Sequence, residues 1–281
     1  MIGGSGPADR SNGGYFVSYR DQFTSDGIAV LWYDKRGVGD STGNWAAGTL
    51  DDLADDAIAA ISALRYRLDD AAPVGLFGHS EGGWVALRAA ARWGKTDFVV
   101  TNSCPGTTPG QADRHAFTSA VSAESWPERD KAAALRLYDD LAEAAAQDRE
   151  YAYVQHFLTS APQYDILRPY IEPLDEAIWA FFKRERDYDP IPDCRRLPCP
   201  HLAIFGTSDR LVPVAESIAA FTAATCNAGR HPAATTTIHV VPDADHRLLT
   251  QGSTVPSASH LAYLCAWIKP APGPGDQVRT T

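Results

Sequence analysis

Ser80 lies between glycines in the stretch LFGHSEGGW, residues 76–84, which matches the pattern G-x-S-x-G. The residues before it form an apolar run that predicts a strand, and those after it have the period of a helix. In that context the pattern indicates a nucleophile elbow, a sharp turn that presents the serine hydroxyl for attack on an acyl carbon. Gly78 and Gly82 would let the strand and the helix approach each other closely. The competing interpretation is an ordinary turn residue, because short patterns of this kind also occur by chance.

A serine nucleophile needs a base, and the base needs a carboxylate that orients it. Asp209 follows the apolar run HLAIFG, residues 201–206, and His246 follows the next such run, TTIHVV, residues 236–241. The carboxyl ends of parallel strands meet at one edge of a sheet, so we expect Ser80, Asp209 and His246 to come together. The sequence therefore predicts a catalytic triad of these three residues.

Other histidines and carboxylates fit these roles less well. His239 lies within a predicted strand, His260 within the last predicted helix, and His79 within the elbow itself. Asp243 and Asp245 stand so close in sequence to the candidate base that we expect them to shape its loop rather than to orient its ring.

An acyl-transfer serine also requires backbone donors for the developing oxyanion, and the loss of one donor typically costs about 3–4 kcal/mol of transition-state stabilisation. The N–H of Glu81, the residue after the serine, is one predicted donor. The glycine-rich start IGGSGPADR, residues 2–10, is expected to supply the second from the N–H of Ser5 or Gly4. The alternative for this stretch is a flexible N-terminal tail.

Short apolar runs bounded by Gly, Pro or Asp alternate with alanine-rich stretches of helical period. We expect buried strands at 28–34, 73–78, 98–102, 201–206 and 236–241, and helices at 50–68, 82–94, 214–225 and 257–268. The alternation predicts a mostly parallel, doubly wound α/β sheet. Over 106–190 no strand signal appears, and two long helical patterns, at 127–158 and 173–185, predict a helical lid. We therefore divide the chain into a core, 1–105 and 191–281, and a lid, 106–190.

The chain has 281 residues, 44% of them hydrophobic, which suits one globular α/β domain with an insertion. Its net charge of −10 argues against a nucleic-acid partner. The cysteines are too few and too irregularly spaced for a disulfide framework or a zinc site, so we expect free thiols. No apolar run approaches the roughly 20 residues of a membrane helix, and no secretory leader precedes the first glycines. These features predict a cytoplasmic protein with no membrane partner and no metal or organic cofactor.

Taken together, these stretches resemble the α/β-hydrolase superfamily, and more narrowly the bacterial esterases with a serine-aminopeptidase-like hydrolase domain. GGSGPADR, residues 3–10, is similar to the family's oxyanion loop, and GHSEGG to its elbow. YDKRGVGDSTG, residues 33–43, is similar to the signature after the next strand. YDPIPDCRRLPCPHLAIFGTSDRLVP, residues 188–213, is similar to the return from the lid to the acid. The similarity extends over nearly the whole chain.

The resemblance implies an α/β-hydrolase fold in which Ser80 is the nucleophile, Asp209 the acid and His246 the base. It also implies that Glu81 and Ser5 supply the oxyanion-hole donors. The charged residues of the 33–43 stretch are expected to build a turn beside the site rather than to bind substrate. These residues are Asp34, Arg36 and Asp40. Members of the superfamily carry further strands before the oxyanion loop, so we expect the first strands to be missing here. The sheet would then expose an edge that is usually covered, which is compatible with a homo-oligomer.

These inferences predict a serine hydrolase that cleaves carboxylic esters of small molecules by a two-step acyl-enzyme route. The same triad would serve a thioesterase or a small-peptide amidase or aminopeptidase, and the sequence does not separate them. Related peptidases bind the substrate's free amine with lid carboxylates. Candidate glutamates lie in the predicted lid of this chain, but nothing in the sequence distinguishes them from ordinary surface carboxylates. They are Glu124, Glu143, Glu172 and Glu176. The remaining alternative is a non-catalytic relative that binds a small molecule or partner in the old active site, and the intact triad argues against it. The sequence assigns no substrate-binding residue.

Overall fold

A parallel sheet forms the centre of the computed structural model, which describes residues 1–68, 72–161, 174–226 and 231–269. The strands are β1 (Leu76–His79), β2 (Val99–Asn102), β3 (His201–Gly206) and β4 (Thr236–Val241). They lie in the order β1-β2-β3-β4, with every pair parallel. His79 pairs with Asn102, and Asn102 pairs with Ile204, so the carboxyl ends of β1 and β2 reach the same level of the sheet. The loops that follow these strands therefore emerge at one edge.

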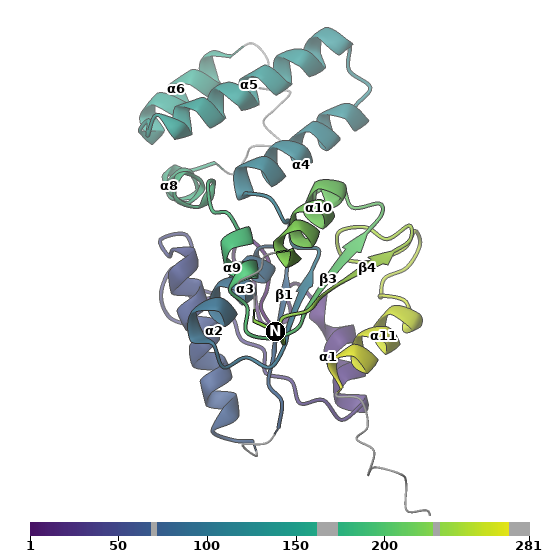
Figure 1. Cartoon of the computed structure of the whole chain (residues 1–281). Coiled ribbons are helices and arrows are strands. Elements are labelled where there is room, and N and C mark those ends of the chain that lie inside the picture. The colour runs from purple at the N-terminus through teal and green to yellow at the C-terminus, as the bar shows by residue number, and fades with distance from the viewer. Residues whose placement is uncertain (69–71, 162–173, 227–230, 270–281) are drawn as a thin grey trace, which may run out of the picture.

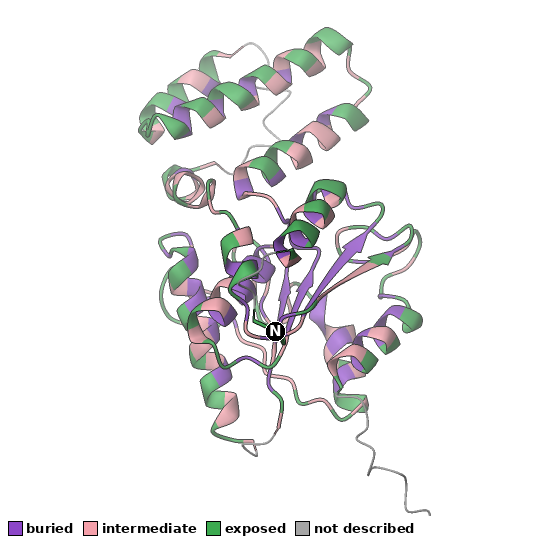
Figure 2. Cartoon of the chain, viewed as in Figure 1, coloured by how far each residue is buried: buried purple, intermediate pink, exposed green. Residues whose placement is uncertain are grey.

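Helices cover both faces of the sheet because successive strand residues point to opposite sides (Figure 1). Leu76, Val99 and Phe205 belong to the core on one face, and their neighbours Phe77 and Val100 to the core on the other. The first face packs against α2 (Leu50–Arg65), α3 (Glu81–Trp93), α9 (Ile191–Arg195) and α10 (Val214–Thr225). The second packs against α1 (Phe16–Ser25) and α11 (Ala258–Ile268). The central strands are accordingly buried along their length, as Figure 2 shows.

A separate group of helices lies beyond the edge of the sheet domain (Figure 1). These helices are α4 (Pro109–Ala123), α5 (Glu128–Ala146), α6 (Tyr151–Ser160) and α8 (Glu176–Glu185). They share an apolar cluster of their own, built around Phe117, Leu137, Leu141, Val154 and Trp179. We call this group the helical cap. It falls within the segment predicted to be a lid, and the proposed boundaries of core and lid stay a prediction.

The structure differs from the sequence-based expectation in several places. Strand β4, predicted to be buried, is mostly half-buried, and the short helix α9 was not predicted. In the segment 28–34, predicted to be a buried strand, residues 28–33 are half-buried or exposed, Asp34 is buried, and no strand ladder forms. A regular ladder needs successive backbone hydrogen bonds to a neighbouring strand. In this segment Leu31 O accepts a hydrogen bond from the Met1 amino group, and residue 2 in turn forms only an isolated bridge to Gly78 of β1. Helix α1 had no predicted counterpart. The helical pattern at 127–158 is broken into α5 and α6 near Asp148, whose φ is 53°.

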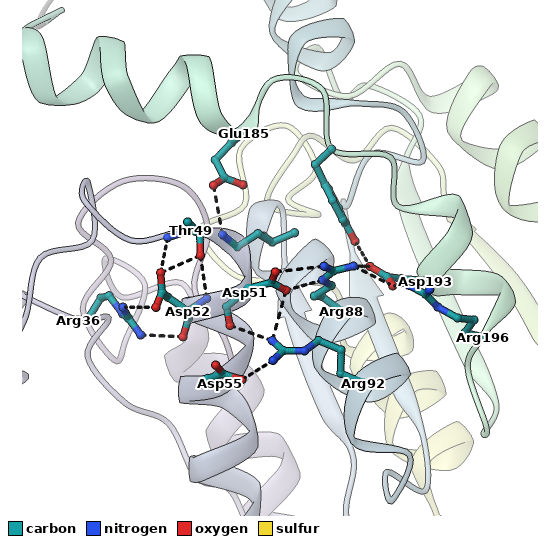
Figure 3. A network of polar contacts seen from close by, with 12 residues as sticks. Arg36, Thr49, Asp51, Asp52, Asp55, Arg88, Arg92, Glu185, Asp193 and Arg196 are labelled. Carbon is teal, nitrogen blue, oxygen red and sulfur yellow. Dashed lines mark hydrogen bonds and ion pairs between the residues drawn. The ribbon is translucent and has the colours of Figure 1, made fainter.

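Ion pairs hold α2 against α3, the helix that follows Ser80 (Figure 3). Arg88 on α3 contacts Asp51 of α2 at 2.7 Å and the buried Asp193 of α9 at 3.3 Å. Thr49 and Asp52 form a capping box at the start of α2, which typically contributes about 1 kcal/mol to helix stability. The elbow therefore rests on a helix braced from two sides. Within the described part of the chain, no helix is both long and apolar enough to cross a membrane.

Candidate active site

Ser80 occupies the turn between β1 and α3 with a backbone conformation that is rare for a residue with a side chain. Its φ is 54° and its ψ is −124°. Such a conformation costs on the order of 1–3 kcal/mol and persists only where the surroundings impose it. The Ser80 N–H donates to Asn102 O at 2.9 Å, which anchors the turn to the end of β2. The strain therefore lies at the residue that the sequence nominates as nucleophile.

Glycines around Ser80 allow this turn to exist. A Cβ atom on Gly78 would lie 2.0 Å from the carbonyl oxygen of Gly82, and one on Gly82 would lie 2.4 Å from Ile2 O. Both distances are far inside van der Waals contact with backbone atoms that cannot move aside. The glycines of GHSEGG thus permit the close approach of strand, helix and N-terminal segment that their spacing indicated.

Asp209 and His246 are joined by a hydrogen bond between Asp209 Oδ2 and His246 Nδ1 at 2.9 Å. The other oxygen of Asp209, Oδ1, accepts from the backbone N–H groups of Leu211 and Val212, at 2.8 and 3.1 Å. The Asp209 side chain is fully buried, whereas His246 keeps 17% of its side chain exposed. The carboxylate is therefore held rigidly by its own loop, and it presents one oxygen to the imidazole.

Backbone contacts hold the Asp209 and His246 loops against each other. Ser208 N–H donates to Ala244 O at 2.8 Å, and a Cβ on Gly206 would lie 2.2 Å from that same carbonyl oxygen. Within the His246 loop, Asp245 Oδ1 accepts from Arg247 N and Leu249 N at 2.8 and 3.0 Å. Asp245 thus shapes the loop, in agreement with its predicted role.

His79 packs between the rings of Tyr15 and His246, with ring centroids 4.7 and 4.9 Å away. Burial, and secondarily the charge of His246, hold the pKa of His79 well below its usual value. His79 is therefore a neutral ring packed in a tilted contact beside the ring of His246. The sequence placed it in the elbow but carried no signal for this contact.

Ser80 and His246 open onto one cavity of about 430 Å³ between the sheet domain and the cap. Its lining includes Gly4, Ser5 and Glu81 from the core. It also includes residues from α4 and α8 of the cap, to which the sequence assigned no substrate-binding role. These are Pro109, Ala112, Asp113, Ala116, Phe181 and Glu185. The structure thus brings the nucleophile and base candidates to one cavity, together with the predicted oxyanion segments.

The predicted oxyanion donors differ in how their N–H groups are used. Among the described residues, no acceptor is found for the N–H of Glu81 or of Ser5, and both residues line the cavity. The Gly4 N–H instead donates to Asn12 Oδ1 at 3.3 Å. Of the two donors expected from the N-terminal loop, Ser5 is therefore the one with an available N–H.

Two cap carboxylates give the cavity an acidic side. Asp113 is an exposed residue that lines the cavity, and reduced hydration of its carboxyl, followed by the charge of Glu81, raises its pKa to about 6. Burial also raises the pKa of Glu185, whose Oε1 accepts from Leu50 N at 3.2 Å (Figure 3). The sequence missed both residues because neither belongs to a motif.

Several residues weighed from the sequence lie outside this cavity. Asp34 is buried in a turn, where Arg10 lowers the pKa of its carboxyl and a Cβ on Gly39 would lie 2.5 Å from Oδ2. Asp34, Arg36 and Asp40 thus belong to the turn and not to the cavity lining, as expected. His239 is half-buried and stacks on Tyr263 and His260, away from the site. Of the four glutamates considered as amine ligands, Glu124, Glu143 and Glu176 do not line the cavity, and Glu172 lies outside the described residues.

A family model described as the alpha/beta hydrolase family matches residues 7–255. An esterase from Pyrococcus furiosus superposes with a TM-score of 0.58 at 17% identity, covering 95% of this chain and 78% of that one. A monoacylglycerol lipase from Paleococcus ferrophilus gives 0.54 at 17% identity, covering 95% and 92%. A thermophilic esterase from Thermogutta terrifontis gives 0.54 at 20% identity, covering 95% and 88%. No curated protein is significantly similar in sequence to this chain. At these identities the structural likeness concerns the fold.

Proposed function

The chain belongs to the alpha/beta hydrolase family, and from that premise we propose that it is a serine hydrolase cleaving carboxylic esters of small molecules. The predicted fold class is confirmed by the family match and by the structural neighbours. In the proposed enzyme Ser80 is the nucleophile, His246 the general base and Asp209 the acid that orients it. The esterase and lipase names of three structural neighbours are consistent with this choice of substrate.

The observation that carries the proposal is the hydrogen bond between Asp209 Oδ2 and His246 Nδ1 beside a cavity that also contains the strained Ser80. A carboxylate that accepts from Nδ1 keeps that nitrogen protonated and leaves Nε2 as the acceptor. Nε2 is the nitrogen that must take the proton from the serine hydroxyl. The arrangement therefore favours the tautomer of His246 that a general base needs.

The reaction follows from these roles. Ser80 Oγ attacks the ester carbonyl carbon as its proton passes to His246 Nε2, and the carbonyl oxygen becomes an oxyanion that accepts from the N–H groups of Glu81 and Ser5. The tetrahedral intermediate collapses, the alkoxide leaves with the proton from His246, and Ser80 carries the acyl group. A water molecule, deprotonated by His246, then attacks the acyl carbon. The bond to Ser80 Oγ breaks, His246 returns the proton to Ser80 Oγ, and the acid is released.

The cavity supports a preference for small, uncharged or cationic esters. Its volume of about 430 Å³ lies in the range of pockets for small molecules. Asp113 and Glu185 line it from the cap, whereas Arg247 is the cation among its described lining residues. A substrate with its own carboxylate would be repelled on the cap side. In this proposal α4 and α8 act as the lid that shapes the pocket.

A thioesterase or an amidase would use the same triad, and a binding protein would use the same cavity without turnover. The deciding experiment is labelling with a fluorophosphonate probe, which reacts only with an activated serine, in wild type, Ser80→Ala and His246→Ala. Hydrolysis of p-nitrophenyl esters of increasing chain length, and of a matched thioester and anilide, then compares the acyl classes. We expect labelling of wild type alone and the highest kcat/KM for a short ester.

The folded state of each variant is checked by circular dichroism. Folded wild-type protein that takes no label and hydrolyses none of the three acyl classes would contradict the hydrolase proposal and favour the binding protein. Faster turnover of the thioester than of the ester would instead indicate a thioesterase, and faster turnover of the anilide would indicate an amidase.

A further inference from the structure

Lys35 is a buried cation beside the two segments that carry the candidate oxyanion donors. Only 8% of its side chain is exposed. Its Nζ donates to Gly4 O at 2.6 Å and to Glu81 Oε1 at 2.7 Å. Glu81 is itself buried, with 5% of its side chain exposed. One ammonium group therefore bridges the N-terminal loop and the first residue of α3.

We propose that Lys35 is a positioning residue that sets the geometry of the oxyanion hole by tying its two halves together. The inference rests on the proposed function, because an oxyanion hole has a purpose only if Ser80 attacks an acyl group. Lys35 comes from neither half. It follows the segment 28–34 and lies 31 residues from Gly4 and 46 residues from Glu81 in the chain.

The link to the N-terminal donor follows from peptide geometry. Gly4 C=O and Ser5 N–H belong to the same peptide unit, which is planar and, as a trans unit, directs these two bonds to opposite sides. When Lys35 holds the carbonyl oxygen, it also fixes the direction of the N–H. The Ser5 N–H is the group that has no acceptor among the described residues, and Ser5 lines the cavity.

Little else in the N-terminal loop resists rotation of this peptide unit. Ser5 is exposed, and Gly6 has a φ of 78°, in the region that glycine enters without penalty. Gly4 N–H is held by Asn12, but that N–H belongs to the preceding peptide unit. Within the described residues, Lys35 is thus the side chain that bonds to the Gly4–Ser5 peptide.

The link to the second donor is electrostatic as well as geometric. Glu81 lines the cavity, and its backbone N–H is the donor that the elbow supplies. An uncompensated carboxylate there would oppose the negative charge that develops on the substrate oxygen. Lys35 cancels that charge at 2.7 Å and holds the side chain in place.

A purely structural role is the competing explanation, and two substitutions separate the two roles. Lys35→Met alone leaves a buried, unpaired carboxylate, which typically destabilises a protein strongly. The double variant Lys35→Met/Glu81→Gln removes the charge imbalance and still lacks the bond to Gly4 O. Arg65→Met is the control, because Arg65 likewise bonds to a carboxylate, Asp97 at 2.6 Å, and to a backbone carbonyl, Lys95 O at 2.8 Å, but outside the cavity lining.

The experiment measures kcat and KM for a p-nitrophenyl ester, the rate of fluorophosphonate labelling, and inhibition by a trifluoromethyl ketone, whose adduct with Ser80 places an oxyanion in the hole. In the folded double variant we expect kcat to fall about 10²- to 10³-fold, as for the loss of one oxyanion donor, with KM within about threefold of wild type. The inhibition constant of the ketone should rise in parallel with the loss of kcat/KM. Arg65→Met should retain the wild-type values.

A double variant that keeps kcat and ketone affinity within about threefold of wild type, whatever its melting temperature, overturns the inference. Should the double variant not fold, Lys35→Leu/Glu81→Gln, which likewise removes both charges and the bond to Gly4 O, is measured in its place and judged by the same KM-against-kcat split. A wild-type protein without esterase activity or labelling contradicts the proposed function instead. The two failures are therefore distinguishable.

Discussion

Asp209→Asn is expected to lower kcat about 10³- to 10⁴-fold with little change in KM. Oδ1 of Asp209 accepts from two backbone N–H groups at 2.8 and 3.1 Å, and Oδ2 accepts from His246 Nδ1 at 2.9 Å. An asparagine would keep its carbonyl oxygen on the two backbone donors, because its NH2 group has no lone pair to offer them. The NH2 group would then face the imidazole.

That NH2 group would donate to His246 Nδ1 and so move the imidazole proton to Nε2. An Nε2 that already carries a proton cannot accept one from Ser80, which removes the general base. The side chain of Asp209 is fully buried, and hydrogen bonds to a charged group contribute about 1.5–3 kcal/mol. The variant should therefore stay folded, with a melting temperature lower by about 3–12 °C.

The assay combines steady-state hydrolysis of a p-nitrophenyl ester with thermal unfolding followed by circular dichroism. Asp243→Asn is the matched control, since it makes the same substitution on the facing loop at a φ of 54°, which asparagine tolerates. We expect the control to keep wild-type kcat within about twofold. If folded Asp209→Asn retained more than about a tenth of wild-type kcat, the tautomer argument would be refuted.

Two further predictions concern strain and charge. Ser80→Gly should abolish activity and raise the free energy of unfolding by about 1 kcal/mol, because glycine adopts a φ of 54° without strain. Urea denaturation measures the change, and an unchanged or lower free energy of unfolding would contradict this prediction. Reduced hydration and then Glu81 raise the pKa of Asp113 to about 6, so its carboxylate is charged above that pH and neutral below it. The ratio of kcat/KM for a neutral ester to kcat/KM for a matched anionic ester should therefore fall between about pH 7.5 and about pH 5. The pH dependence of the chemical step is common to both esters and cancels in this ratio. Asp113→Asn should show the weak preference throughout, whereas a wild-type ratio independent of pH would exclude this role.

Strand positions were predictable where a run of apolar residues also had a neighbour to pair with. The runs at 98–102 and 201–206 each became a buried strand, because both lie in the interior of the sheet order. The run at 28–34 is also apolar, but a ladder depends on a partner strand, and among the described residues this run makes only isolated backbone bonds, such as the one from the Met1 amino group to Leu31 O. Hydrophobic pattern therefore identifies a candidate strand, and pairing decides whether it becomes one.

Helix ends were less predictable in the cap. The helical pattern at 127–158 continues through the break between α5 and α6. Asp148 adopts a φ of 53° at this break, and no glycine or proline marks the position in the sequence. Tertiary packing of both helices in one apolar cluster favours the break, since Leu141 of α5 and Val154 of α6 are buried together. Such contacts lie outside any local window of sequence.

Residue types and their spacing are enough to predict the candidate active site of this protein. The glycines around Ser80, and the order of Ser80, Asp209 and His246 after successive apolar runs, are consequences of residue type and spacing, and the family match agrees with the fold they imply. The tertiary structure alone decided which polar side chains gather around that chemistry. Lys35 bonds across 31 and 46 residues, and Asp113 reaches the cavity from an inserted helix. The hydrophobic periodicity of the sequence does not predict these contacts, because they form only when segments distant in sequence pack together.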